Sequence, residues 1–182
     1  MIKEDFFSTY EIEFANKDIG EHIFNFHVSS DFFSYFENSL VEQLESDVKI
    51  VLSKQDEGLF ILNFLLKGKM NLRCDRCLSK FDFPFESNQK VVLKIGEKNE
   101  NNEAFENIAY VGYNDTTLNI SKFIYEFISE KLPMKKTCDL IGKKCDEQML
   151  SKLDDLSLNS KENKIDPRWE GLKKLKNKLK EE

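Results

Sequence analysis

Four cysteines in two close pairs are the residues of this 182-residue chain whose type and spacing best suit chemistry. Cys74 and Cys77 lie in the sequence CDRC, and Cys138 and Cys145 form a second pair with six residues between them. Paired thiols serve as redox sites, as metal ligands or, packed as small apolar residues, as parts of a core. The choice among these uses depends on whether the two pairs meet in the folded chain.

Four thiolates are the right number and type of ligand for a closed tetrahedral zinc site. Two features of the spacing oppose this interpretation. The six-residue second spacer is wider than the usual two to four residues, so its two sulfurs need not point to one place. The 60 residues between Cys77 and Cys138 are about four times the usual gap of about 15, but this matters less. A fourfold longer loop costs about 1.2 kcal/mol of closure entropy, whereas a structural zinc ion can contribute on the order of 10 kcal/mol to folding. The candidate ligands of a structural zinc ion are Cys74, Cys77, Cys138 and Cys145, with His22 and His27 as possible substitutes for a weak ligand.

Redox catalysis by CDRC is the alternative that the local pattern disfavours. A catalytic CxxC usually begins a helix, whose N-terminus lowers the pKa of the thiol. Here Met70, Leu72 and Cys74 alternate along one predicted strand, and alternating phenylalanines follow at residues 81–85. The pattern therefore predicts that CDRC lies at a hairpin turn, as in a zinc ribbon. Cysteines that are buried without a metal remain a third interpretation.

The elements that must position these cysteines are mainly strands. Because the apolar residues alternate and the turns are short, the first hundred residues predict an antiparallel meander sheet. Such a sheet can stay open or close into a barrel, and the sequence does not decide which. Pro84 has no amide hydrogen, so its strand is expected at an edge or with a bulge. The expected strands are residues 24–28, 48–52, 59–66, 70–74, 81–85, 90–95 and 108–113.

Helices complete a predicted α+β fold. Apolar residues at helical spacing predict helices over residues 31–44, with Asp31 as N-cap, and over residues 120–132, before Pro133. A short helix is expected over residues 147–156. We expect residues 1–156 to form the β domain with its packed helices, and residues 157–182 to form a linker and a basic amphipathic helix.

Charge is distributed unevenly along the chain, although the net charge is only −6. Residues 1–60 carry 4 basic and 13 acidic side chains, whereas residues 131–182 carry 14 basic and 10 acidic ones. An acidic region can attract a basic protein, and a basic region can bind nucleic acid, although either can also be a solvated surface. The predicted nucleic-acid or partner-binding residues are Lys135, Lys136, Lys143, Lys144, Arg168, Trp169, Lys173, Lys174 and Lys176.

Several classes of protein are disfavoured by what the sequence lacks. It has no GxSxG, HExxH or glycine-rich phosphate loop, so we predict no enzymatic activity and no small-molecule substrate. The longest apolar run, residues 59–66, has eight residues and is interrupted by Asn63, far from the roughly 18 of a membrane span, and no signal segment is visible. We therefore expect a cytoplasmic protein with no membrane partner. Thiols are normally reduced there, which favours metal binding over a disulfide.

Two parts of the sequence resemble motifs of the YceD family, the large ribosomal RNA subunit accumulation proteins. CDRCL followed by FDFPF is similar to the first motif, and DPRWEGLKKLK from Asp166 is similar to the last. Between them lie a helix ending in KLP and the loop with Cys138 and Cys145. The resemblance covers roughly residues 70–180. The family often has a tighter, more cysteine-rich second cluster than this chain.

The resemblance implies a non-enzymatic cytoplasmic factor that supports accumulation of large-subunit ribosomal RNA and thus ribosome assembly. Ribosomal RNA or a ribosomal protein of the large subunit would be its partner. Two alternatives remain: a general protein-interaction module with a structural zinc ion, and a thiol redox protein.

Overall fold

The computed structural model describes residues 6–37, 39, 41, 43–56, 58–96 and 107–157. The chain divides into two compact units, Met1–Cys145 and Asp146–Glu182. The described strands and all four cysteines belong to the first unit, and the second contains α4 (Glu147–Leu156), the short helix expected there. The basic helix expected near the C-terminus lies outside the described residues. The boundary at residue 156 therefore stays a prediction.

The main sheet contains five strands in the spatial order of their numbers. Its first four strands pair antiparallel, which confirms the predicted meander, whereas the fifth pairs parallel with the fourth. In the described part of the chain the first and last strands are the edges, so the sheet stays open. The strands are β2 (Gly20–Ser29), β3 (Gln43–Lys54), β4 (Leu59–Arg73), β5 (Lys80–Ile95) and β6 (Ile108–Val111).

The two central strands are longer than the sequence pattern predicted. Residues 59–66 and 70–74 are not separate strands, because β4 runs without interruption from Leu59 to Arg73, and β5 likewise joins residues 81–85 to 90–95. Gly68 allows this continuity: a Cβ atom there would meet the Glu45 carbonyl oxygen and lie 2.7 Å from the Cα of Ser46. Without a side chain at this position, β4 passes close to β3 and keeps its register.

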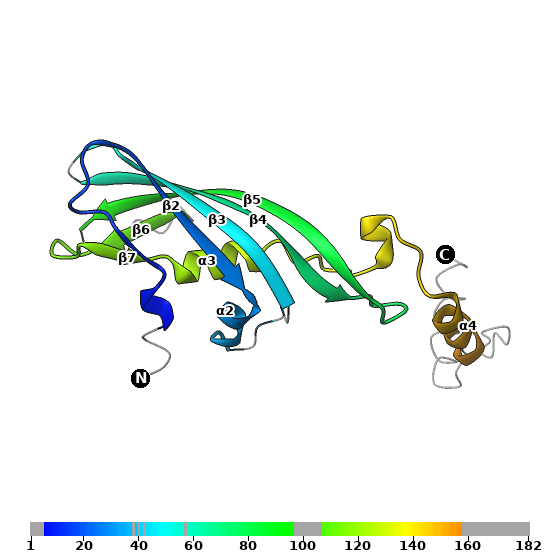
Figure 1. Ribbon diagram of the computed structural model, residues 1–182. Coiled ribbons are helices and arrows are strands. Elements are labelled where there is room, and N and C mark those ends of the chain that lie inside the picture. The colour runs from blue at the N-terminus through cyan, green and yellow to red at the C-terminus, as the bar shows by residue number, and fades with distance from the viewer. Residues whose placement is uncertain are drawn as a thin grey trace, which may run out of the picture. The chain divides into compact units, whose positions relative to one another are not determined.

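Alternate residues of β3 and β4 face the core, and on β3 this confirms the alternation that the sequence predicted over residues 48–52. Ile50, Leu62 and Phe64 are completely buried. The helix α3 (Ser121–Ser129) covers this face of the sheet (Figure 1). Its residue Phe127 packs against Phe64 of β4, with the ring centroids 5.2 Å apart. The helix expected over residues 120–132 is thus confirmed, with shorter ends.

The helix expected over residues 31–44 is wrong in length. Among the described residues of this segment only α2 (Ser30–Ser34) is helical, its N-cap is Ser29 rather than Asp31, and Leu44 belongs to the buried face of β3. The apolar spacing reflects an aromatic cluster instead, since Phe36 stacks on Tyr125 with ring centroids 4.1 Å apart. Side chains that pack on several neighbours can imitate the spacing of one helix face.

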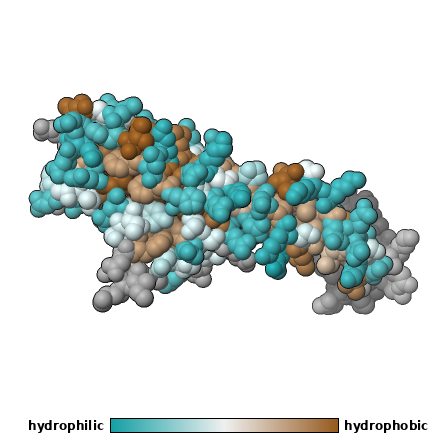
Figure 2. Space-filling view, viewed as in Figure 1, coloured by the Kyte–Doolittle hydropathy of each residue, from teal (hydrophilic) through white to brown (hydrophobic). Residues whose placement is uncertain are grey.

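The remaining elements and the outer surface complete the first unit. Strand β1 (Glu11–Glu13) pairs antiparallel with β7 (Thr117–Asn119) in a separate two-stranded sheet. Pro84 has a strand neighbour on one side only, as expected, because β6 pairs with β5 over Val92–Ile95 alone among the described residues. Hydrophilic side chains cover much of the face seen in Figure 2, with hydrophobic ones between them. Among the described helices, none has the length and apolar character needed to cross a membrane.

Candidate metal centre

The first cysteine pair lies in the turn that joins β4 to β5. The Cys74 amide donates to the Ser79 carbonyl at 2.9 Å, and the Leu78 amide donates to the Cys74 carbonyl at 3.0 Å. Leu78 closes the turn with a left-handed backbone, at a φ of 61°. CDRC therefore occupies a hairpin turn, as predicted, and not the start of a helix.

The second pair is brought together by a folded spacer. The 3-10 helix η2 (Cys138–Ile141) begins at the first cysteine of this pair, and Gly142 follows with a φ of 68°. The Lys143 amide then donates to the Cys138 carbonyl at 3.1 Å, which turns the chain back toward Cys145. The wide spacer, which opposed a metal site on sequence grounds, is thus compact enough to direct both sulfurs inward.

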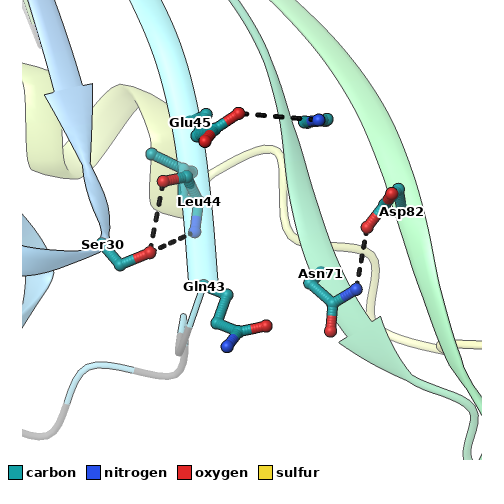
Figure 3. Close-up of a pocket in the computed structure, with 7 residues that line it drawn as sticks. Ser30, Gln43, Leu44, Glu45, Asn71 and Asp82 are labelled. Carbon is teal, nitrogen blue, oxygen red and sulfur yellow. Dashed lines mark hydrogen bonds and ion pairs between the residues drawn. The ribbon is translucent and has the colours of Figure 1, made fainter.

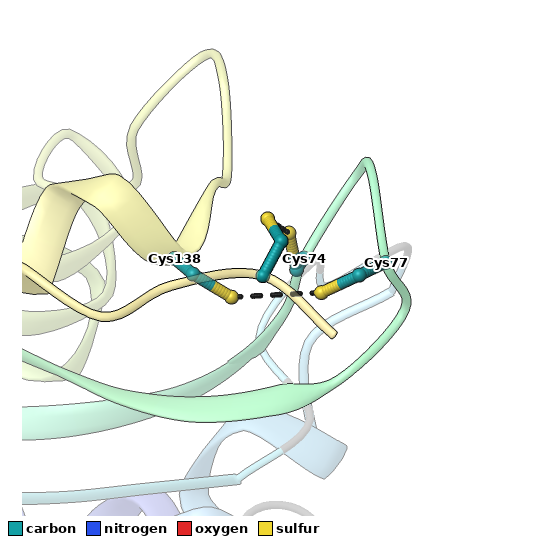
Figure 4. Close-up of side chains that lie close together, drawn as sticks. Cys74, Cys77 and Cys138 are labelled. Carbon is teal, nitrogen blue, oxygen red and sulfur yellow. Dashed lines mark hydrogen bonds between the residues drawn. The ribbon is translucent and has the colours of Figure 1, made fainter. Parts of the chain in front are cut away.

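The two pairs meet in one cluster. All four sulfur atoms lie within 4.8 Å of one another, and all four side chains are buried. The Sγ atoms of Cys77 and Cys138 are 3.6 Å apart and point toward each other (Figure 4), and those of Cys74 and Cys145 are 3.8 Å apart. A tetrahedral ion with Zn–S bonds of 2.3 Å requires sulfurs about 3.8 Å apart. The geometry and the donor set therefore fit a zinc ion.

The thiols of the cluster cannot all ionise without a compensating cation. Burial raises the pKa of Cys138 to about 12, helped by hydrogen bonds with the neighbouring thiols, and burial likewise raises the pKa of Cys145. Burial also tends to raise the pKa of Cys74. Hydrogen bonds from the backbone amides of Cys77 and Arg76 outweigh this effect, so the pKa of the Cys74 thiol is lowered overall. Four thiolates at this spacing repel one another, and a divalent cation is what would stabilise them together.

Contacts outside the sulfurs also join the hairpin turn to the loop of the second pair. The Asp75 amide donates to the Lys136 carbonyl at 2.6 Å, and the Lys136 amide donates to the Asp75 carboxylate at 2.7 Å. Arg76 adds a half-exposed ion pair with Asp139 at 3.7 Å. The sequence pattern did not single out Asp75, although its position inside CDRC was a usable signal.

The other predicted site residues have varied positions. His22 lies 2.9 Å from the Asp18 carbonyl and His27 lies 2.9 Å from the Asp47 carboxylate, so the described metal-type cluster contains cysteines alone. Lys135, Lys143 and Lys144 are exposed beside the cluster, whereas Lys136 is half-buried. Arg168, Trp169, Lys173, Lys174 and Lys176 lie outside the described residues.

A shallow pocket on the sheet is a second place where polar side chains gather (Figure 3). Asn71 donates to Asp82 at 2.8 Å, and Lys69 pairs with Glu45 at 3.5 Å. The Ser30 hydroxyl accepts from the Leu44 amide at 3.0 Å. These groups therefore satisfy one another within the sheet.

Fold and site together define a mixed α+β protein whose curved sheet is tied to a following loop by four cysteines. Residues 62–176, more than half of the chain, match the family described as the large ribosomal RNA subunit accumulation protein YceD. The chain belongs to this family, which is named for an accumulation factor and not for a reaction. The match begins within β4 and includes all four cysteines. Neither the curated proteins nor the solved structures gave a match.

Proposed function

We propose that this protein is a non-enzymatic cytoplasmic factor that supports accumulation of large-subunit ribosomal RNA during ribosome assembly. It acts by binding ribosomal RNA, a ribosomal protein of the large subunit, or both. Membership of the YceD family carries this proposal. The charge distribution supports it, because a chain that is acidic over residues 1–60 and basic over residues 131–182 can contact partners of opposite charge.

We further propose that Cys74, Cys77, Cys138 and Cys145 bind a structural zinc ion. The sulfur spacing and the burial of all four thiols support this ligand set. With four protein ligands the site would be closed, so the ion would supply folding energy and no open position for a substrate. It would hold the β4–β5 turn against the loop that begins at η2.

Metal content is the direct test of the zinc proposal. Protein purified without a histidine tag should contain one zinc ion per chain by mass spectrometry. All four thiols should resist a thiol reagent until a chelator is added. Metal-free protein with freely reactive Cys138 and Cys145 would contradict the proposal.

Affinity purification through a salt gradient tests the proposed function. The tagged full-length protein should recover large-subunit ribosomal RNA precursors or ribosomal proteins at low salt and release them as salt rises. A tagged acidic protein of similar size that is not a family member serves as the control bait. Recovery of neither kind of partner above this control would contradict the proposal.

A general protein-interaction module is the second candidate, favoured by the acidic composition of residues 1–60 and by the amphipathic pattern of residues 166–182 in the sequence. Deleting residues 157–182 should then abolish contact with a partner protein while the sheet stays folded. Unchanged partner binding by the truncated chain would count against this candidate.

A further inference from the structure

Exposed cations lie close to the clustered cysteines along the chain. The members of this basic surface each lie within three residues of a clustered cysteine, and three of them directly precede one: Arg73, Arg76, Lys80, Lys135, Lys143 and Lys144. Because the four sulfur atoms lie within 4.8 Å of one another, the chain segments that carry these cations come together at the cluster. Half of them come from the β4–β5 hairpin, to which the sequence assigned no binding role.

From this arrangement we propose that the basic surface binds the phosphate backbone of base-paired RNA, with the hairpin cations contributing as much as the loop lysines. The proposal rests on the function proposed above and assigns it a contact surface. It also makes RNA binding depend on the cysteine cluster, since the cluster brings the two halves of the surface together.

The positive charge exceeds what the proposed metal site needs. Residues 73–80 and 131–145 carry eight basic and two acidic side chains, although the whole chain has a net charge of −6. A zinc ion bound by four thiolates has a net charge of −2, and Lys131 pairs with Glu130 just outside these segments at 3.5 Å, which leaves an excess of three positive charges. The next residues, Asp146 and Glu147, begin the second unit, where Asp146 caps α4. The excess is therefore available to an external anion.

Strand register supports the same conclusion. Arg73 and Lys80 are directly opposite each other in the last pair of the β4–β5 ladder. Like charges in this relation destabilise a sheet, and a bound phosphate between or beside them would relieve the repulsion. Within the described chain neither side chain has an ion-pair partner, and the same holds for Lys135, Lys143 and Lys144.

The chemistry of the surface favours base-paired RNA over the other partners. Ribosomal proteins that contact RNA are themselves mostly basic, so a positive surface would repel them. Recognition of single-stranded RNA relies on bases stacked on aromatic side chains. Residues 73–80 and 131–145 include no aromatic residue. A surface of arginine and lysine alone suits contacts to backbone phosphates, which a duplex presents in regular rows.

Paired charge reversals in the full-length zinc-loaded protein test both halves of the surface. The hairpin variant is Arg73→Glu with Lys80→Glu, and the loop variant is Lys143→Glu with Lys144→Glu. The probe is a synthetic RNA duplex of about 20 base pairs, titrated by fluorescence anisotropy at several salt concentrations. Each variant should weaken duplex binding at least about tenfold, and the salt slope should fall by about one for each lost phosphate contact.

A matched control separates local contact from overall charge. Lys90→Glu with Lys94→Glu makes the same charge change at exposed positions on β5, at the other end of the hairpin. At 0.1 M salt screening acts over about 10 Å, so this control should change affinity less than about twofold. The neutral pair Arg73→Gln with Lys80→Gln, checked for zinc content and circular dichroism, should also weaken binding and guards against misfolding.

Several outcomes would overturn the proposal. These are unchanged duplex affinity in both variants, loss in the loop variant alone, equal loss in the control, tighter binding of the matching single strand, or equally effective competition by polyglutamate. The proposed function fails separately, if the wild-type protein recovers neither ribosomal RNA nor ribosomal protein. If the hairpin variant recovers as much ribosomal RNA as wild type, the function stands and this surface is wrong.

Discussion

Two parts of the β4–β5 hairpin, the part that packs against α3 and the turn, are buried by different chemistry. Toward the middle of the sheet Phe64 packs against Phe127 of α3, with ring centroids 5.2 Å apart. At the turn the buried atoms are the sulfurs of four cysteines, joined to the loop by a few hydrogen bonds around Asp75. We call the part around Phe64 and Phe127 the hydrocarbon end and the turn with the four cysteines the cysteine end.

This difference teaches how each end gains its stability. Burial of aromatic and aliphatic side chains contributes about 25 cal/mol per Å² and needs no cofactor. A cluster of thiols buries little apolar area, and its polar atoms would be stabilised best by a cation. We therefore expect the hydrocarbon end of the hairpin to fold without metal, whereas the stability of the cysteine end should depend on a bound metal.

The largest expected effect comes from the cysteines. Cys77→Ser and Cys138→Ser should each abolish binding of the proposed zinc ion, because a site with three thiolates binds it far more weakly. The two variants should lose similar amounts of unfolding free energy, and the double variant should lose little more. Denaturant unfolding of the full chain, with metal content measured on the same samples, tests this prediction.

A chelator provides the control for the cysteine variants. It should lower the stability of the wild-type protein to that of the variants and leave the variants unchanged. Additive losses in the double variant would mean that Cys77 and Cys138 do not share an ion. After the chelator has removed the metal, amide hydrogen exchange should become faster at the β4–β5 turn and not in the middle of β3 and β4.

A substitution at the hydrocarbon end should lower the stability of the protein without affecting metal binding. Phe64 is completely buried, so Phe64→Ala should cost about 3–5 kcal/mol of unfolding free energy through the lost burial and the cavity left behind. The variant should still bind metal. The matched control is Leu65→Ala on the next residue of β4, which faces the other side of the sheet and is 39% exposed. If the control is as costly as Phe64→Ala, the assignment of the core face is wrong.

The hydrocarbon end was also the more predictable from sequence. Alternation of apolar residues can be recognised from neighbouring residues alone, and over residues 48–52 it correctly placed Val48, Ile50 and Leu52 on one buried face. The same reading failed at residues 31–44, because aromatic side chains that contact Tyr125 of a distant helix imitate helical spacing. Local patterns do not show which distant element a side chain contacts.

The cysteine cluster could be predicted in composition but not in geometry. Residue type identified the four candidate ligands, and the alternation around Cys74 identified the hairpin turn. The meeting of the pairs depends on the fold of residues 138–145, where a 3-10 turn and the left-handed Gly142 reverse the chain. The joining contact between Asp75 and Lys136 spans 61 residues of sequence and could only be seen in three dimensions.

A smaller effect is expected at Gly68, which lies between the two ends. An alanine there would place its Cβ 2.7 Å from the Cα of Ser46 and against the Glu45 carbonyl, so β3 and β4 must separate locally. We expect Gly68→Ala to cost about 1–3 kcal/mol, despite the small entropic gain of removing a glycine. Gly58→Ala, in the β3–β4 turn with nothing closer than 3.9 Å, is the control and should be nearly neutral. Thermal unfolding of both variants decides the comparison.

The smallest predicted effect concerns the contacts that support the cysteine cluster without metal. Asp75→Ala removes the 2.7 Å hydrogen bond from the Lys136 amide. It should cost about 1 kcal/mol of unfolding free energy, because the exposed amide can donate to water instead. Asp139→Ala removes an ion pair of 3.7 Å between half-exposed groups and should cost less than about 0.5 kcal/mol. In metal-free protein the Asp75 variant should also expose the cysteines to a thiol reagent faster than the Asp139 variant does. Equal rates would mean that the sulfurs alone join the turn to the loop.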